Sequence, residues 1–365
     1  MAFPPLVAPA ASLSDAERVR TARQLRLTEI GELGQLRLAA ARVGVLGAGG
    51  IGSPVLLYLA STGVGTIGII DDDDVERSNL QRQIAFGTAD VGRPKTTVAA
   101  ERIRALAPDV RIVEHRARLT DANAQELLGG YDLIIDGSDS FDTRYAVADA
   151  CDVLGIPLVW GSVLRFDAQV SVFWSRPSSG SPMRLRDVFP EPPAAGTVPS
   201  CADAGVLGSL CGQVGSMLVT EAVKLICGIG EPLVGRMLVL DALSGRTREI
   251  PLAAPSRPAA LPRVSPEELA ELIAEEPTIT LLDVREPDEF AAGSIPGARS
   301  VPLRTLLADP AAVDVTGTIV VFCQQGPRAR AAGRALAAAH PDADLRLLAG
   351  SYAAWSAAFE PSGTL

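Results

Sequence analysis

The residues of this chain that are best suited to chemistry include a glycine motif followed by an acid and several anion-binding side chains. Gly47, Gly49 and Gly52 fit the pattern G-x-G-x-x-G, in which missing Cβ atoms let the backbone turn sharply and approach a phosphate. Asp71 follows at the distance where an acid holds a ribose hydroxyl in nucleotide-binding folds. Three further polar side chains come soon afterwards: Asn79, Arg82 and Lys95. The set predicts a nucleotide site with cations beside the phosphates.

The glycine motif can bind a phosphate only if a strand precedes it and a helix follows it. Residues 43–46 are an apolar run that predicts the first strand, and residues 66–70 predict a second, buried strand. Between them we expect a helix with Ser53 as its N-cap, Pro54 as its first residue and Gly63 just after its end. The N-terminus of this helix would face the glycine turn and offer N–H groups to an anion.

Two fixed cations and an amide beside a phosphate site favour ATP over NAD. A nicotinamide enzyme needs little positive charge beside the pyrophosphate. Phosphoryl or nucleotidyl transfer, in contrast, builds negative charge on the phosphate oxygens and releases an anion. Two other functions stay open from these residues: a scaffold or sensor that binds a nucleotide without turnover, and an NAD-dependent oxidoreductase.

A second acidic group follows a short apolar strand predicted at residues 133–135. Asp139 and Ser140 come just after it, at the strand end where ligands collect in open α/β sheets. Residues 175–200 contain six prolines and predict a long irregular loop that leads to Cys201. Further strands are predicted at 110–114, 156–160, 169–174 and 237–240, with helices within 14–41 and 90–109.

Length and composition predict two α/β domains. With 365 residues and 47% apolar content, the chain can bury more than one core. Residues 14–250 would form a Rossmann-like domain with a mainly parallel sheet, and the proline-rich residues 251–262 a linker. Residues 263–365 would form a smaller α/β domain. Its predicted strands are 280–283 and 318–322, and its predicted helices are 265–275 and 329–339.

Net charge and cysteine usage limit the partners and the compartment. A net charge of −10 argues against nucleic acid or an anionic membrane as the main partner. Five cysteines without a C-x-x-C pair indicate a reducing cytoplasm and thiol chemistry. Residues 206–226 are as long and apolar as a membrane span, but Gln213, Glu221 and Lys224 favour a buried helix. We therefore expect a cytoplasmic protein with no membrane or nucleic-acid partner.

Two sets of motifs resemble known families. The runs GAGGIG at 47–52, YLASTGVG at 58–65 and SNLQRQ at 78–83, with Lys95 beyond them, resemble the MoeB/ThiF/HesA adenylating enzymes, which activate ubiquitin-like sulfur carriers. The run LLDVREPDEFAAGSIPGARSVPL at 281–303, and CQQGPR from Cys323 to Arg328, resemble a rhodanese domain. The order of the domains is similar to adenylyltransferase/sulfurtransferase fusions of the MoeZ type.

The resemblance implies that ATP and Mg²⁺ act on a ubiquitin-like sulfur-carrier protein ending in Gly-Gly, whose carboxylate attacks the α-phosphate. Arg82 and Lys95 would stabilise the transition state, and Asp139 would hold the magnesium. Arg23, in the RxxRQ pattern at 20–24, would reach the nucleotide site of the partner in a homodimer. The implied nucleotide-binding set comprises Gly47, Gly49, Gly50, Gly52, Asp71, Asp73, Ser78, Asn79, Arg82, Lys95, Asp139 and Ser140.

Two departures from the family pattern concern metals. Family members bind a structural zinc through two C-x-x-C pairs, but Met183 and Arg186 stand in the place of the first pair. Residues 251–264 hold no counterpart of the second pair, so we predict no zinc. Ser140 stands where an asparagine usually follows the metal-binding aspartate, and we expect the magnesium site to tolerate it.

Cys323 is the predicted sulfur carrier. It ends an apolar strand and opens a loop into an alanine-rich helix, so backbone N–H groups and Arg328 would lower its thiol pKa and stabilise a persulfide. In the same domain, Ser294 replaces the family's usual histidine and Ala329 a common serine.

Cys201 matches a family position proposed to form a thioester or disulfide with the carrier, and its role stays open. Cys151, Cys211 and Cys227 are expected in the core. The sulfur donor would be thiosulfate or a cysteine desulfurase, and the carrier and pathway stay open.

Overall fold

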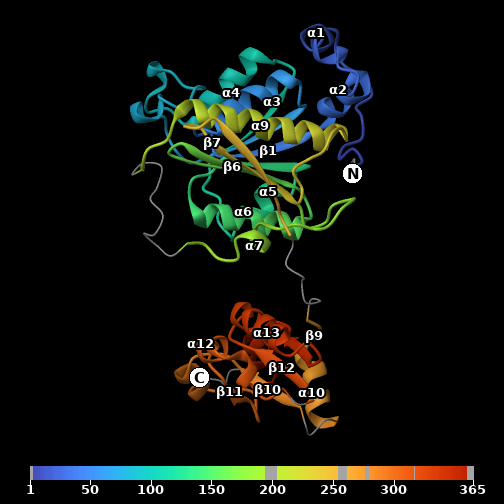
Figure 1. Ribbon diagram of the computed structural model, residues 1–365, viewed down its shortest axis with the longest axis vertical. Coiled ribbons are helices and arrows are strands. Elements are labelled where there is room, and N and C mark those ends of the chain that lie inside the picture. The colour runs from blue at the N-terminus through green and yellow to red at the C-terminus, as the bar shows by residue number, and fades with distance from the viewer. Residues whose placement is uncertain (1–2, 194–203, 254–260, 276–278, 316, 360–365) are drawn as a thin grey trace. The chain divides into compact units, whose positions relative to one another are not determined.

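The computed structural model describes residues 3–193, 204–253, 261–275, 279–315 and 317–359. The chain divides into two compact units, Met1–Pro255 and Ser256–Leu365 (Figure 1). The linker predicted at 251–262 falls largely outside the described residues, and Pro251 itself ends a strand.

The first unit is built on an eight-stranded sheet in the order β3-β2-β1-β4-β5-β6-β7-β8. The first five of these strands are parallel, and β6, β7 and β8 extend the sheet antiparallel. The strands are β1 (Arg42–Leu46), β2 (Thr66–Ile70), β3 (Arg111–His115), β4 (Leu133–Asp136), β5 (Leu158–Leu164), β6 (Asp167–Phe173), β7 (Arg236–Asp241) and β8 (Arg246–Pro251).

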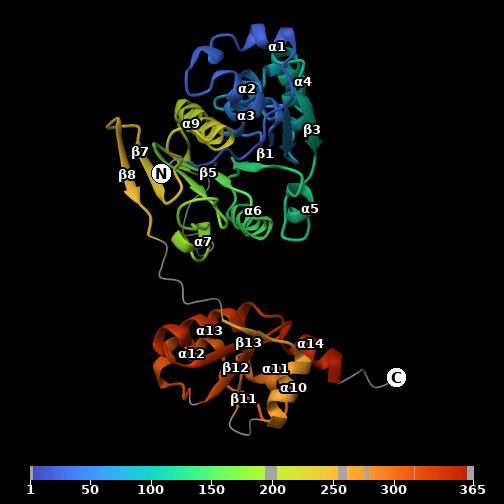
Figure 2. The same cartoon turned by 90° about the vertical axis from the view of Figure 1, so that its right-hand side faces the viewer.

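Helices cover both faces of this sheet (Figures 1 and 2). One core joins the sheet to α2, α3, α4 and α9, and the other joins it to α5, α6 and α7. The helices are α1 (Asp15–Arg20), α2 (Gly31–Ala40), α3 (Gly52–Thr62), α4 (Lys95–Leu106), α5 (Ala124–Leu128), α6 (Phe141–Leu154), α7 (Leu185–Val188) and α9 (Gly208–Cys227), with short 3-10 turns η1 (Gln24–Arg26), η2 (Arg77–Asn79) and η3 (Thr88–Asp90).

The second unit has a five-stranded parallel sheet in the order β11-β10-β12-β13-β9. One of its cores contains α12 and α13, and the other contains α10 and α14. The elements are β9 (Arg263–Val264), α10 (Pro266–Glu275), β10 (Thr280–Asp283), α11 (Pro287–Ala291), β11 (Arg299–Ser300), α12 (Leu303–Ala308), η4 (Pro310–Ala312), β12 (Thr318–Phe322), α13 (Pro327–Ala339), β13 (Asp344–Leu348) and α14 (Ser351–Phe359).

Both units confirm the α/β class, but several local predictions were wrong. The single helix expected within 14–41 is broken into α1, η1 and α2, and Gly31 begins α2 with φ +52°. Helix α3 begins at Gly52 with Ile51 as its N-cap, so Ser53 lies inside the helix and donates a hydrogen bond to the carbonyl of Ala48 at 3.2 Å. Gly63 ends α3 as predicted, with φ +85°.

The last strand of the first unit is β8, beyond the strand predicted at 237–240. All six residues of β8 are exposed, and among the described strands it pairs with β7 alone. A polar, exposed edge strand has no buried apolar face, so its sequence carries no strong strand pattern. The second unit likewise has three strands that were not predicted: β9, β11 and β13.

Helix α9 is the apolar segment that resembles a membrane span. By length and composition it could cross a membrane, but 61% of its most apolar window is buried inside the protein. It packs on α3 and the sheet, which agrees with the prediction of a buried core helix (Figure 1).

Candidate functional site

A pocket lies at the carboxyl ends of β1, β2 and β4, where the strand order reverses. In a doubly wound sheet this switch point is where ligands bind. The predicted residues that line the pocket are Gly47, Gly49, Gly50, Asp71, Asp73, Arg82, Lys95, Asp139 and Ser140.

The glycine turn is held together by close backbone contacts. Gly47 has φ +83°, in the left-handed region that favours glycine. A Cβ atom on Gly52 would lie only 1.8 Å from the carbonyl oxygen of Gly47, so no other residue fits there. A Cβ atom on Gly50 would press on Arg82 and Cys211 at 3.1–3.2 Å. Gly52 does not line the pocket; it allows α3 to begin directly beneath the turn.

Asp71 ties the end of β2 to the glycine turn. One of its carboxylate oxygens accepts the N–H of Ala48 at 2.7 Å, and the other accepts the N–H of Asp73 at 2.9 Å. Burial raises the pKa of Asp71, and the nearby Lys95 opposes this effect. The carboxylate therefore fixes the turn and also lines the pocket.

Lys95 and Arg82 are the two predicted cations that line the pocket. Lys95 is the first residue of α4 and only 5% exposed, and its Nζ lies 2.6 Å from the carboxylate of Asp73. The contact from Arg82 to the carbonyl of Ser78 is long, at 3.4 Å. The Arg82 guanidinium has no ion pair among the residues that the structure describes, so its charge is available to an anion.

Ser78 and Asn79 lie outside the pocket lining, in the turn that carries Arg82. The amide oxygen of Asn79 accepts the N–H of Glu76 at 3.3 Å, and its amide nitrogen donates to Ser78 at 3.3 Å. Ser78 donates to the Glu76 carboxylate at 3.1 Å. Both side chains thus hold the η2 turn in place, and their contact with a nucleotide stays a prediction.

Asp139 is an exposed carboxylate on the pocket wall, with no hydrogen bond or ion pair among the described residues. An oxygen ligand of this kind suits Mg²⁺, which usually binds through one or two carboxylates together with substrate phosphates. Ser140 caps α6 by accepting the N–H of Thr143 at 3.1 Å. Asp139 therefore fits a magnesium ion, for which it would supply an oxygen ligand.

Gln83, Arg118 and Arg144 are among the pocket residues that were not singled out from the sequence. Gln83 is 3% exposed, and its amide oxygen has no hydrogen-bond partner among the residues that the structure describes. Arg144 donates twice to the carbonyl of Ser138, at 3.0 and 3.3 Å, and so fixes the backbone next to Asp139. The sequence signal for Arg144 was its place in the first turn of a helix capped by Ser140, directly after a strand.

Arg23, Cys211 and Cys201 differ in how they relate to the pocket. Arg23 is exposed beside η1 and does not line the pocket of its own chain. Cys211 is buried as predicted, but its sulfur also lines the pocket beside Gly50. Cys201 falls outside the described residues, so its role stays a prediction.

Cys151 and Cys227 have the surroundings of core thiols. Burial raises the pKa of Cys151 well above its ordinary value and that of Cys227 to about 11, as expected for inert core thiols.

The residues that stand in the place of the first zinc-ligand pair have other contacts. Met183 is 2% exposed, and its backbone forms hydrogen bonds with the backbone of Trp174. Arg186 donates to both oxygens of Asp149 at 2.7 Å.

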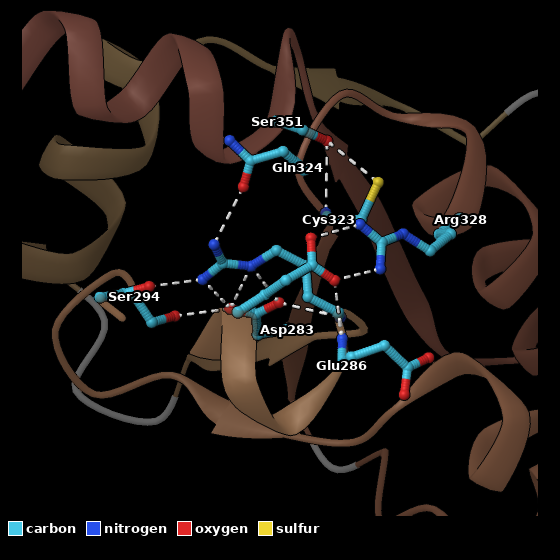
Figure 3. A network of polar contacts seen from close by, with 10 residues as sticks. Asp283, Glu286, Ser294, Cys323, Gln324, Arg328 and Ser351 are labelled. Atoms are coloured by element: carbon cyan, nitrogen blue, oxygen red, sulfur yellow. Dashed lines mark hydrogen bonds and ion pairs between the residues drawn. The ribbon is translucent and has the colours of Figure 1, made fainter. Parts of the chain in front are cut away.

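In the second unit, Cys323 follows β12 and lies at the base of the loop that enters α13 (Figure 3). It is 1% exposed, and its Sγ accepts the N–H of Gly326 at 3.0 Å. The hydroxyl of Ser351 lies 3.4 Å from the Cys323 nitrogen and 4.0 Å from its Sγ. The Gly326 N–H and the Ser351 hydroxyl thus lie beside the sulfur, and the role of Cys323 as the sulfur carrier stays a prediction.

Arg328 has a stronger partner than the sulfur. Its guanidinium binds both carboxylate oxygens of Glu289, at 2.5 and 2.7 Å. This pairing lowers the pKa of Glu289 to about 2 and raises the pKa of Arg328, with Cys323 adding a smaller effect. Arg328 thus joins the loop to α11, and its charge is largely neutralised.

A buried ion pair between Arg285 and Asp283 supports the loop that follows Cys323. Arg285 is 2% exposed and bonds Asp283 at 2.7 Å, and it also donates to Gln324 at 3.0 Å. Ser294, which stands at the usual histidine position, donates to Asp283 at 2.7 Å (Figure 3). Because every member has a partner, this network fixes the residue that follows Cys323.

Comparison with known proteins identifies the families of the two units. Residues 21–260 match the ThiF family, and residues 265–358 match the rhodanese-like domain. The chain is 44% identical over 386 residues to the probable adenylyltransferase/sulfurtransferase MoeZ of Mycobacterium tuberculosis, with 98% of each chain covered. It is 50% identical over 230 residues to the sulfur carrier protein adenylyltransferase of Thermus thermophilus, covering 62% of this chain and 84% of that protein.

Solved structures share the fold of the first unit. Escherichia coli MccB, solved with ATP, is 19% identical with a TM-score of 0.55, covering 67% of this chain and 74% of that chain. The relatives give no support to an oxidoreductase or a non-catalytic scaffold. The chain therefore belongs to the ThiF family, which uses ATP, and with its rhodanese-like domain it is an adenylyltransferase/sulfurtransferase.

Proposed function

We propose that the chain adenylates the C-terminal Gly-Gly carboxylate of a ubiquitin-like sulfur carrier and converts it to a thiocarboxylate with sulfur from Cys323. The observation that carries the first half is the convergence of the glycine turn, Arg82, Lys95 and Asp139 on one pocket. The relative from T. thermophilus is named for a sulfur carrier, which supports this substrate class.

The adenylation step follows from the charges in the pocket. The carrier carboxylate attacks the α-phosphorus of ATP, a new P–O bond forms, and pyrophosphate leaves with the electrons of the broken bond. Arg82 and Lys95 offset the repulsion between the carboxylate and the polyphosphate, and the glycine turn admits the phosphates close to its backbone. Magnesium, when held by Asp139, supplies further charge neutralisation.

Exchange of labelled pyrophosphate into ATP, dependent on a Gly-Gly-ended carrier, tests this step. Arg82→Ala and Lys95→Ala should each lower exchange about a hundredfold or more, because each removes charge made use of in the transition state. Arg104→Ala is the matched control: Arg104 is an exposed arginine near the end of α4 that does not line the pocket. Full exchange in the Arg82 and Lys95 variants would contradict the assignment.

The sulfur step uses the acyl-adenylate that the first step makes. The outer sulfur of the Cys323 persulfide attacks the acyl carbon, AMP leaves, and an acyl disulfide joins the carrier to Cys323. A second thiol, for which Cys201 is our candidate, then attacks the Cys323 sulfur and releases the thiocarboxylate. This leaves a disulfide that an external thiol must reduce. Cys323→Ala should keep pyrophosphate exchange and abolish thiocarboxylate formation with thiosulfate, as mass spectrometry of the carrier would show.

We further propose that the first unit needs no structural zinc and that the protein is cytoplasmic. Met183 and Arg186 support the first point, because one is buried among apolar side chains and the other is paired with Asp149. Elemental analysis of the purified protein should find less than one zinc per chain. Stoichiometric zinc would mean that other residues supply the ligands.

A further inference from the structure

The rhodanese-like site contains a second arginine that, unlike Arg328, keeps its charge free. Arg330 lies one turn into α13, is exposed, and has no side-chain hydrogen bond or ion pair among the residues that the structure describes. Arg328, in contrast, gives two guanidinium bonds to Glu289. An anion that approaches Cys323 would therefore meet the charge of Arg330 with less competition from a carboxylate.

The Arg330 guanidinium folds back over the loop of Cys323. A Cβ atom placed on Gly326 would lie 3.1 Å from Nη1 of Arg330 and 4.0 Å from Oγ of Ser351. The N–H of Gly326 is itself the donor to the Cys323 sulfur, at 3.0 Å. A guanidinium, a hydroxyl and a backbone N–H thus gather around one glycine beside the sulfur. Gly326 has φ +111° and no side chain, which leaves this space open.

Ser351 occupies a backbone conformation that is unfavourable for its residue type. It has φ +56°, one of only two non-glycine residues with positive φ among those that the structure describes, and it is fully buried. Glycine would adopt this conformation without strain. What a glycine could not provide is the hydroxyl beside the nitrogen and sulfur of Cys323 (Figure 3).

We propose that Arg330 and Ser351 form an anion subsite that binds the oxyanion group of a small sulfane-sulfur donor of the thiosulfate class. This inference rests on sulfur transfer at Cys323. Arg330 determines specificity by binding the sulfonate end of the donor. Ser351 and the Gly326 N–H stabilise the negative sulfur at Cys323.

The step balances without an added oxidant or reductant. The Cys323 thiolate attacks the sulfane sulfur of thiosulfate, a Cys–S–S bond forms, and the S–S bond of thiosulfate breaks. Sulfite leaves with the electron pair, so one monoanion and one dianion give one monoanion and one dianion. Because a thiolate and a dianion repel each other, the Arg330 guanidinium beside Gly326 favours their approach.

The test is steady-state sulfur transfer from thiosulfate to cyanide by the full-length protein. Arg330→Gln should raise KM for thiosulfate about tenfold or more, and Arg330→Lys should recover part of the loss. Arg334→Gln is the matched control, because Arg334 is an exposed arginine one turn further along α13, and its KM should stay within about twofold. With the uncharged donor diallyl trisulfide, Arg330→Gln should behave like the wild type. Equal losses with both donors would overturn the anion subsite.

Ser351→Gly separates a chemical role from a structural one. The variant should melt at the same or a higher temperature, because it relieves a left-handed serine, yet it should form the Cys323 persulfide about tenfold more slowly. An unchanged rate would remove Ser351 from the proposal.

Two further outcomes separate this proposal from the proposed function. Persulfide formation from a cysteine desulfurase but never from thiosulfate would overturn the anion subsite and leave sulfur transfer at Cys323 intact. Undiminished sulfur transfer by Cys323→Ala would instead refute the role of Cys323 itself.

Discussion

Individual glycines of the nucleotide turn have different physical roles, although they belong to one motif. Gly52 is required by packing, because its Cα faces the carbonyl of Gly47. Gly49 faces open space: the nearest atom to a Cβ there is the Gln83 amide nitrogen, 3.9 Å away. Gly52 therefore serves the fold, and Gly49 leaves room for a ligand.

Gly52→Ala should destabilise the protein by at least about 3 kcal/mol, because the methyl group would overlap the Gly47 carbonyl. Gly49→Ala should keep wild-type stability and weaken ATP binding, since the methyl group fills space that a phosphate would use. Thermal unfolding and ATP titration of both variants measure the two effects. Equal stability of the pair would contradict the packing argument.

The Arg328–Glu289 pair makes the stability of the sulfur-transfer loop depend on pH. The folded pKa of Glu289 is about 2, below its ordinary value of 4.5. A lowered carboxyl pKa stabilises the fold at pH values above about 4.5, and this stabilisation is lost as the pH falls toward 2.

Glu289→Gln should therefore speed hydrogen exchange in the Cys323 loop and α11 at pH 6, and the difference from wild type should shrink as the pH approaches 2. Comparison with wild type at each pH removes the intrinsic pH dependence of exchange. The control is Glu271→Gln, an exposed residue of α10 without an ion pair among the described residues. A difference between Glu289→Gln and wild type that did not change with pH would rule out the ion pair as its cause.

At the scale of elements, Gly212 and Gly215 make the core helix α9 look like a packed membrane helix, and only one of the two is explained by packing. Gly215 lies against α3: a Cβ there would be 2.6 Å from Pro54 Cγ and 2.9 Å from the Ile51 carbonyl. Gly212, on the same helix, has nothing within 4 Å of the corresponding position. Close approach of α3 and α9 explains Gly215, and no contact explains Gly212.

Gly215→Ala should destabilise the protein by about 1–3 kcal/mol through overpacking against α3. Gly212→Ala should leave stability unchanged or raise it by up to about 1 kcal/mol, because alanine favours a helix over glycine. Denaturant unfolding of the two variants gives the comparison. If both variants were more stable than the wild type, α3 and α9 would have to lie further apart than the structure shows.

At the scale of the whole molecule, the nucleotide site lacks a contribution from Arg23 of its own chain, since Arg23 does not line the pocket. We expect a homodimer in which each Arg23 enters the partner's site. A mixture of Arg23→Ala and Arg82→Ala subunits should then regain about a quarter of wild-type pyrophosphate exchange, because half of the dimers contain one intact site. Absence of recovery after proven subunit exchange would remove the cross-subunit role.

The sequence by itself determined the α/β class, the two chemistries and nine of the residues that line the pocket. The β1-turn-α3-β2 unit and the C-x-x-G-x-R loop are local in sequence, and their glycines and apolar runs specify them directly, although the N-cap of α3 was predicted wrongly. The edge strand β8 and the short strands β9 and β11 were missed, because pairing with a neighbour, and not a buried apolar face, makes them strands.

Only the tertiary structure decided which charged groups stay free. The motif suggested Arg328 as the cation of the sulfur site, but Glu289, far along the chain, binds both of its donor nitrogens. Arg330 belongs to no motif that we identified, and α13 folds its guanidinium over Gly326. Charge at a site depends on distances between side chains from separate elements, and those distances are set by packing and not by spacing in the sequence.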